Sequence, residues 1–166
     1  MNKRGNKKPV KREKPEYEQK LLDLARVTRV VKGGRRFRFR ATLVIGNRKG
    51  QVGVGVAKGS DVSDSIQKAF NDAKKSLIAV KIDRNTIPHS VAQKLGSAKI
   101  LMKPAKEGRG IIAGGAVRAV VDLAGIRDIV SKSLGSSNKL NVARATIAAL
   151  ASLKEPKNKE VIAEEK

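Results

Sequence analysis

The central stretch of the chain alternates between charged and apolar side chains. Residues 32–55 read KGGRRFRFRATLVIGNRKGQVGVG, and within them three arginines alternate with three apolar residues: Arg36, Arg38 and Arg40 with Phe37, Phe39 and Ala41. Successive side chains of a strand point to opposite faces, so the pattern predicts a strand with one cationic and one apolar face. The turn residues of Asn47–Gly50 predict a hairpin with a second strand over 51–58. A solvated strand face that only deters edge pairing explains one such triplet equally well.

The segments that flank this hairpin complete a small β-β-β-α domain. Apolar residues within 17–32 predict a strand with an irregularity near Arg26, although a helix over 16–24 also fits, and the three strands would form one antiparallel sheet. Apolar residues recur every three or four positions over 62–77, which predicts an amphipathic helix. We expect this helix to cover the apolar sheet face and to bury its side chains, Phe37, Phe39, Leu43 and Ile45.

The second half of the chain alternates between short strands and helices. Its pattern predicts strands over 78–82, 91–95 and 98–102, a glycine-rich connection over 104–115, a helix over 116–124 ended by Gly125, a strand over 127–134 and a helix that follows 135–138 and reaches Leu153. We therefore expect an α+β fold with two domains, over 17–79 and 80–153. Because each core is small, the domains should pack on one another or depend on a partner for rigidity. Residues 1–16 should form a disordered basic arm and residues 154–166 a flexible tail.

The charge of the chain changes the interpretation of the hairpin. Thirty-seven Lys and Arg residues against fifteen Asp and Glu give a net charge of +22. Such a field favours a polyanionic partner, with nucleic acid ahead of an anionic membrane. Without cysteine, and with a single histidine, the sequence predicts no thiolate chemistry, metal centre or cofactor. One tyrosine and three phenylalanines are few for base stacking, and no apolar run is long enough to span a membrane.

The loop Gly108–Gly115 is the strongest candidate for enzymatic chemistry. Glycines before a helix start suit phosphate binding, but no Gly-Lys-Ser/Thr follows and the loop does not match a dinucleotide fingerprint. The carboxylates of the 62–77 helix suit capping and solvation better than acid–base catalysis. We therefore expect no enzyme, and a nucleotide-dependent enzyme that binds ATP at this loop is the less favoured alternative.

The β-β-β-α order is similar to that of double-stranded-RNA-binding modules, which recognise the shape of A-form helices. Those modules place lysines at the start of the final helix, whereas this helix starts with the sequence SDVSD at 60–64. RNA contact is therefore expected from the hairpin loop and the strand face rather than from the helix end.

Five longer motifs occur in a fixed order: GRRFRF at 34–39, GNRKGQVGVG at 46–55, IQKA at 66–69, GRGIIAGGAVRAV at 108–120 and GSSNKLNVARAT at 135–146. Together they closely resemble the signature of the bacterial small-subunit ribosomal protein five family, over about 18–153. The resemblance implies a double-stranded-RNA-binding-like N-terminal domain and a C-terminal α+β domain with a left-handed βαβ unit.

The resemblance also implies a function. It implies a non-enzymatic, cytoplasmic constituent of the small ribosomal subunit that binds small-subunit ribosomal RNA and lies beside ribosomal proteins four and eight at the messenger entry side. Assembly, translational accuracy and unwinding of messenger RNA are the processes it would support. Residues 26–35 match the family's spectinomycin-resistance loop, and residues 108–118 match a region that is linked to accuracy and lies close to protein four.

These arguments select the site residues. RNA contact is expected from Arg26, Arg29, Lys32, Gly33, Gly34, Arg35, Arg36, Arg38, Arg40, Arg48, Lys49, Lys58 and Arg109. Contact with a protein partner is expected from Gly108, Gly110, Gly114 and Arg118. The alternative function is a free-standing RNA chaperone or duplex-RNA-binding regulator, which would not comigrate with small ribosomal subunits.

Overall fold

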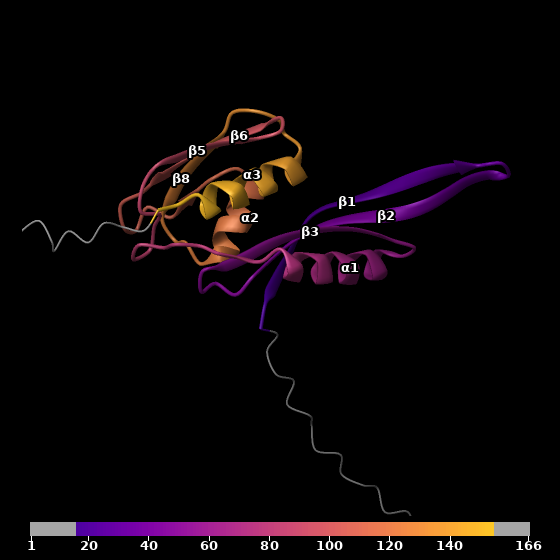
Figure 1. Ribbon diagram of the computed structural model, residues 1–166, viewed down its shortest axis with the longest axis horizontal. Coiled ribbons are helices and arrows are strands. Elements are labelled where there is room, and N and C mark those ends of the chain that lie inside the picture. Colours follow the sequence, from indigo (N-terminus) through magenta and orange to yellow (C-terminus); the bar gives the residue numbers. More distant parts are fainter. Residues whose placement is uncertain (1–15, 155–166) are drawn as a thin grey trace, which may run out of the picture.

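A computed structural model describes residues 16–154, which form two four-stranded sheets and three helices (Figure 1). The elements in chain order are β1 (Glu18–Val31), β2 (Gly34–Gly46), β3 (Gln51–Gly59), α1 (Val62–Lys75), β4 (Ile78–Ala79), β5 (Val91–Leu95), β6 (Ala98–Pro104), β7 (Ile111–Ile112), α2 (Gly115–Ala124), β8 (Ile129–Ser133) and α3 (Lys139–Ala151). The α+β class is as predicted. The expected basic arm and flexible tail lie outside the described residues, apart from their inner ends at positions 16 and 154.

The first sheet has the order β1-β2-β3-β4, and each neighbouring pair is antiparallel. The three predicted strands are present, and the short strand β4 adds a fourth. The helix considered for 16–24 is wrong, because residues 18–24 pair with β2 as a strand. The irregularity expected near Arg26 is also misplaced, since the register shifts between Leu21 and Asp23.

The β-bulge decides which side chains of β1 face which layer. Before it, Leu21 pairs with Leu43; after it, Asp23 pairs with Thr42. The extra residue, Leu22, packs against the core on the side of the second sheet. The bulge therefore places Leu24, rather than Asp23, opposite Ala41 on the face that α1 covers.

Helix α1 covers one face of the first sheet. Ala41, Leu43 and Ile45 of β2 are buried against it. A Cβ atom added to Gly55 of β3 would overlap the backbone of α1, so the small residue permits this close packing. The expected burial of Phe37 is wrong, because its side chain is 45% exposed. Strand β3 ends at Gly59, opposite Phe39, so the sheet and α1 stop short of Phe37.

The second sheet has the order β5-β6-β8-β7. The predicted 91–102 hairpin, helix α2 and last strand and helix are all present within a residue or two of their expected ends. Strand β7 lies inside the expected glycine-rich connection and pairs with β8 in parallel, so β7, α2 and β8 form a βαβ unit. Its left-handedness stays a prediction. Of the strand predicted over 78–82, only β4 forms, and it joins the first sheet.

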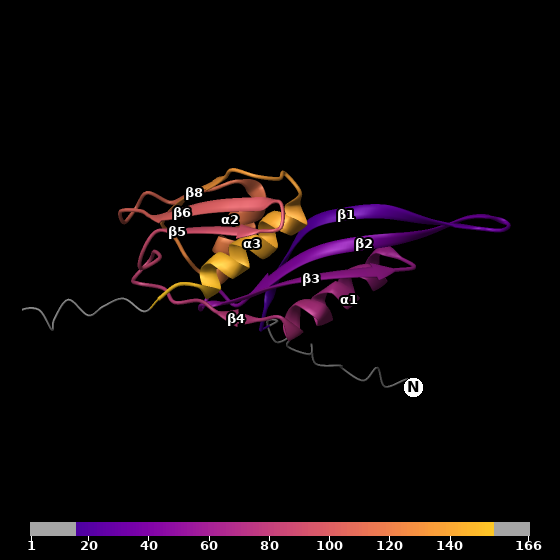
Figure 2. The same ribbon diagram turned by 45° about the horizontal axis from the view of Figure 1, so that its top comes forward.

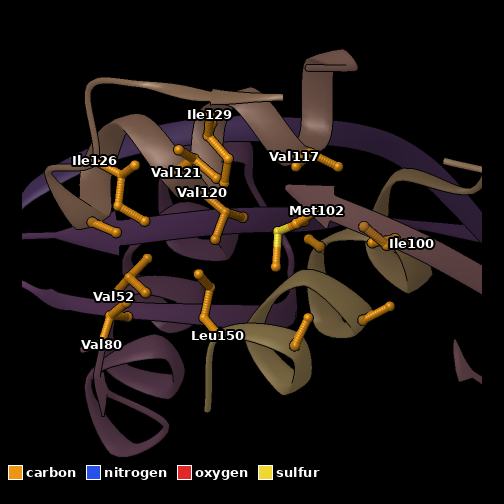
Figure 3. Close-up of a cluster of buried hydrophobic side chains, with 14 of the residues drawn as sticks. Val52, Val80, Ile100, Met102, Val117, Val120, Val121, Ile126, Ile129 and Leu150 are labelled. Carbon is orange, nitrogen blue, oxygen red and sulfur yellow. The ribbon is translucent and has the colours of Figure 1, made fainter. Parts of the chain in front are cut away.

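The two halves share one apolar core, as expected from their small size. Helices α2 and α3 lie between the two sheets (Figures 1 and 2). Val44, Val52 and Val54 of the first sheet belong to the same buried cluster as side chains of α2, α3 and the second sheet, including Val120, Met102 and Leu150 (Figure 3). Residues 41–46 of β2 and 52–55 of β3 are therefore covered on both faces, which accounts for the nearly continuous apolar sequence of these parts of the strands.

The turn between β2 and β3 is bonded to the end of α2. The backbone N–H of Arg48 donates to the Leu123 carbonyl over 3.0 Å, and that of Gly50 donates to the Ala124 carbonyl over 2.9 Å. Gly125 ends α2 in the left-handed conformation, with φ of 93°, as its position in the sequence predicts. A Cβ atom there would overlap the backbone of Arg48. The junction between the two halves is thus a direct backbone contact.

Candidate nucleic-acid interface

The β1–β2 hairpin extends well beyond the rest of the first sheet. Strand β3 pairs with β2 only from Phe39 to Gly46, whereas β1 pairs with β2 as far as its tip at Val31 and Gly34. Residues 27–38 therefore form a two-stranded arm without a third strand, and it projects from the molecule in both ribbon views (Figures 1 and 2). We call these residues the hairpin arm.

One face of the hairpin arm and of the sheet at its base, which we call the arginine face, carries five of the eleven predicted cations. In the register, Arg36 pairs with Arg29, Arg38 with Val27, and Arg40 with Lys58. Paired residues share a face, so the prediction that Arg36, Arg38 and Arg40 lie together is confirmed. Five of the predicted RNA-binding residues lie on this face: Arg29, Arg36, Arg38, Arg40 and Lys58. A groove of about 500 Å³ here has Arg29, Arg36, Arg38 and Lys58 among its lining residues.

The opposite face of the arm, which we call the phenylalanine face, carries two further predicted cations. Arg35 pairs with Val30 and Arg26 pairs with Phe39. Both pairs lie on the same face as the Thr28–Phe37 pair between them. The guanidinium carbon of Arg26 lies 3.6 Å from the centre of the Phe37 ring. The arm is thus cationic on both faces, which the alternation of three arginines did not predict.

The tip of the arm is open. Lys32 and Gly33 form the turn between the strands, and Lys32, Gly33 and Gly34 are all exposed. No heavy atom outside the neighbouring residues lies within 4 Å of a Cβ atom added to Gly33 or Gly34. The backbone at the tip is therefore accessible to a partner, as the glycine pair predicts.

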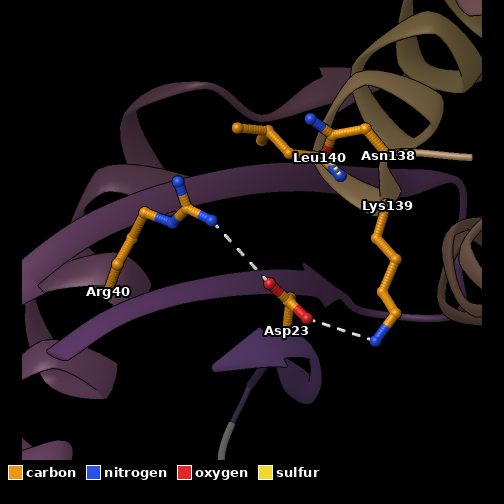
Figure 4. Close-up of polar contacts among 5 residues, drawn as sticks. All are labelled: Asp23, Arg40, Asn138, Lys139 and Leu140. Carbon is orange, nitrogen blue, oxygen red and sulfur yellow. Dashed lines mark hydrogen bonds and ion pairs between the residues drawn. The ribbon is translucent and has the colours of Figure 1, made fainter. Parts of the chain in front are cut away.

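Asp23 partly neutralises the base of the arginine face (Figure 4). Its Oδ2 atom lies 3.9 Å from Nη2 of Arg40, and its Oδ1 atom accepts a hydrogen bond of 3.2 Å from Nζ of Lys139 at the start of α3. The side chains are 35–58% exposed, so each pair contributes less than about 1 kcal/mol. The carboxylate of Asp23 links the base of the arginine face to the second half of the chain. No signal in the sequence identified this residue.

Arg48 and Lys49 lie far from the hairpin arm. They occupy the turn at the other end of β2, which places them roughly 30 Å from the arginine face at the rise of a β-strand. Nη2 of Arg48 is 2.9 Å from Oε2 of Glu18. The structure therefore divides the predicted RNA-binding residues into two separate groups.

Arg48 of the second group lies beside Arg118, which was assigned to contact with a protein partner. Arg48, Arg118, Asp122 and Arg127 line one cleft of about 380 Å³ beside the end of α2. Sequence reasoning did not identify Arg127. Arg127 is the first residue of the strand predicted over 127–134, lies two residues before β8, and belongs to no motif that would mark it.

The glycine loop before α2 is partly closed by a carboxylate. The N–H of Gly110 donates a 2.7 Å hydrogen bond to Oδ1 of Asp128, which is buried immediately before β8 rather than inside a strand as expected. That amide is therefore occupied and faces a negative charge. A Cβ atom at Gly108 or Gly114 would meet nothing within 4 Å, and Arg109 is exposed. The loop is open at its surface and unsuited to a phosphate at Gly110.

The start of α1 is acidic, in keeping with the expectation that RNA does not contact it. Oδ2 of Asp64 accepts a 2.8 Å hydrogen bond from Nζ of Lys68 and a longer one from the Ser60 amide. The hydrogen bond from Lys68 is the main cause of a lowered pKa for Asp64. The carboxylate thus stays charged at neutral pH, where it would repel phosphate.

The described part of the chain shows neither a metal-binding cluster nor a membrane-spanning helix. Residues 16–154 contain no group of three His, Cys, Asp or Glu side chains placed to hold a metal ion. No helix in that range is long and apolar enough to cross a bilayer.

Comparison with known proteins identifies the family. Proteins named small ribosomal subunit protein uS5, from Campylobacter jejuni strains 81-176 and RM1221, are 56% identical to this chain over 139 residues, which is 84% of the chain and 95% of each relative. The chain belongs to the ribosomal protein S5 family. Models of the N-terminal and C-terminal domains of ribosomal protein S5 match residues 17–81 and 93–166. The resemblance drawn from the five motifs is therefore confirmed, and the S5 family is structural rather than enzymatic.

Proposed function

We propose that the protein is a structural constituent of the small ribosomal subunit and binds small-subunit ribosomal RNA chiefly through the hairpin arm. The relatives are named as proteins of that subunit. The observation that carries the proposal is the arginine face. There Arg29, Arg36 and Arg38 of the two-stranded arm line one groove together with Lys58, near the end of β3.

The mode of binding follows from the chemistry of this face. Guanidinium groups hold phosphate oxygens through paired hydrogen bonds, and such contacts position RNA without selecting a sequence. Cations on one face of a strand are held at a spacing that the rise of the strand sets. They therefore fit the phosphates of a folded RNA, which are also held at fixed positions, better than those of a flexible RNA. The arm would therefore recognise the shape and charge of folded RNA.

The remaining predicted residues belong to a second set of contacts. We assign Arg48 and Lys49 to RNA at the other end of β2, and Arg109 to RNA at the glycine loop before α2. Gly108, Gly110, Gly114 and Arg118 are assigned to contact with ribosomal protein four, and ribosomal protein eight is proposed as a second neighbour. The open surface of the glycine loop and the exposure of Arg118 support close approach by a partner. Roles in assembly, accuracy and messenger entry belong to this proposal through the family resemblance.

The test is the sedimentation of tagged protein in cell lysate. The wild-type protein should comigrate with the small subunit, and a variant with Arg35, Arg36 and Arg38 replaced by Gln should move to the light fractions. A matched control replaces Lys94, Lys99 and Lys132, exposed lysines of the second sheet, by Gln and removes the same charge. It should still comigrate.

Two outcomes would contradict the proposal. Comigration of the triple arginine variant at wild-type level would show that the arm is not the main RNA contact. Wild-type protein found only in the light fractions would instead favour a free-standing RNA-binding protein, and a steep loss of its binding with salt would still identify phosphate contacts.

A further inference from the structure

The phenylalanine face of the hairpin arm has no covering element within residues 16–154. Helix α1 covers Ala41, Leu43 and Ile45 further along β2, and the arm extends beyond it (Figure 2). Val30 is 76% exposed and Phe37 45% exposed on this face. Large apolar side chains gathered on the projecting part of a strongly basic protein indicate a binding surface.

The side chains on this face are arranged for stacking. The Arg26 guanidinium lies over the Phe37 ring at 3.6 Å, and Arg26 is itself exposed. Among the described residues, Arg26 has no ion pair or hydrogen bond through its side chain, and this contact holds its planar group in place. Nucleobases that are splayed out of a helix stack on guanidinium planes and on aromatic rings.

Charge selects the occupant of this face. Arg26 and Arg35 place two cations beside Phe37 and Val30, so a partner with a flat apolar group and a nearby anion fits best. A nucleotide combines a base with a phosphate. A base inside a duplex already has both faces stacked, whereas an unpaired base has a face to offer.

We propose that the phenylalanine face binds one unpaired RNA base, which stacks on the Arg26–Phe37 pair while the arginine face holds phosphates. This inference rests on the proposed RNA-binding function and narrows its ligand to a bulged or looped-out nucleotide. It departs from the expectation that so few aromatic residues argue against stacking, because a single base needs only one ring and one guanidinium.

The test compares three RNA probes with the full-length protein. The first is a duplex with one unpaired adenosine, the second carries an abasic nucleotide at the same position, and the third is fully paired. Fluorescence anisotropy at one salt concentration gives the Kd for each. The first two probes have the same phosphates, so their difference reports the base. We expect the wild-type protein to bind the adenosine probe about 5-fold or more tighter than the abasic probe.

Four variants locate the effect. Phe37→Leu removes the ring and Arg26→Lys removes the planar group but keeps the charge, so both should bring the ratio of the two Kd values close to one. Phe37→Tyr keeps a ring and should preserve the ratio. Arg38→Gln, on the opposite face, should weaken binding to the three probes by a common factor. Thermal unfolding followed by circular dichroism checks that each variant is folded.

A second readout is the fluorescence of 2-aminopurine placed at the unpaired position, which should fall on binding to the wild-type protein and to Phe37→Tyr. Equal wild-type affinity for the adenosine and abasic probes would overturn base stacking but not phosphate binding. A protein segment would then be the better candidate for the partner that covers this face. Failure of the wild-type protein to bind any probe would overturn the RNA-binding function and, with it, this inference.

Discussion

Replacing Gly125 by alanine should separate the two halves of the molecule at their closest backbone contact. Gly125 ends α2 with φ of 93°, a conformation that L-residues with a side chain rarely adopt. An added Cβ atom would also overlap the backbone of Arg48 in the β2–β3 turn. The substitution therefore causes strain within α2 and displaces the turn that is bonded to it.

The expected cost has two parts. Forcing a residue with a Cβ atom into a left-handed conformation costs about 1–2 kcal/mol. Moving the turn weakens the hydrogen bonds from Arg48 to Leu123 and from Gly50 to Ala124, at about 0.5–1.5 kcal/mol each. The sum is about 2–5 kcal/mol, a large share of the 5–15 kcal/mol by which a typical domain is stable.

Two other glycines serve as matched controls. Gly96 has φ of 57° and open space around its Cβ position, so Gly96→Ala isolates the conformational strain, about 1–2 kcal/mol. Gly46 lies outside the left-handed region, but a Cβ atom there would overlap the backbone of Leu123, so Gly46→Ala isolates the collision. Urea unfolding followed by circular dichroism gives the free energy of unfolding of each variant.

The comparison decides whether the backbone contact matters. If Gly125→Ala loses no more stability than Gly96→Ala, the turn moves aside freely and the junction contributes nothing beyond local strain. A loss close to the sum of the two controls would instead show that strain and collision act independently.

Three further predictions concern charge. Replacing Arg36 and Arg38 together by Gln should weaken binding to duplex RNA and lower the slope of log Kd against log salt concentration by about 1–2. The slope falls because the variant makes fewer phosphate contacts and so releases fewer counterions from the RNA when it binds. Asp23→Asn should cost less than about 1 kcal/mol of stability but tighten RNA binding at low salt. The control Glu18→Gln, in β1 opposite the far end of β2, should not tighten RNA binding at the arm. Asp64→Asn should destabilise the protein above about pH 4, and the difference should disappear as pH falls through the lowered pKa of Asp64, as thermal unfolding at several pH values would show.

Much of the fold follows from local signals in the sequence. The alternation around Arg36, Arg38 and Arg40 and the turn at Asn47–Gly50 predict the hairpin because strand and turn chemistry act over a few residues. Gly125 marks the end of α2 for the same reason. Strand β7 was missed because Ile111–Ile112 is too short for periodicity and depends on pairing with β8.

The candidate site was only partly predictable, because exposure depends on the lengths of neighbouring elements. Phe37 and Phe39 both alternate with arginines, so the pattern places both side chains on the apolar face of the strand. Whether that face is covered depends on where β3 stops, at Gly59. The nine residues of β3 against thirteen in β2 are the signal that could have indicated an uncovered tip. The pairing of Asp23 with Lys139 spans 116 positions and leaves no local trace.

The shared core has a consequence for how the chain is made. Val44, Val52 and Val54 are buried by α2 and its neighbours, and about 70 residues separate Val54 from Leu123. At a synthesis rate of about 5–20 residues per second, roughly 4–14 s pass before those helices can emerge. During that interval the first sheet has α1 on one face and nothing of its own chain on the other. The nascent N-terminal half is therefore exposed to aggregation until the second half has been translated, and the pace of translation becomes part of its folding.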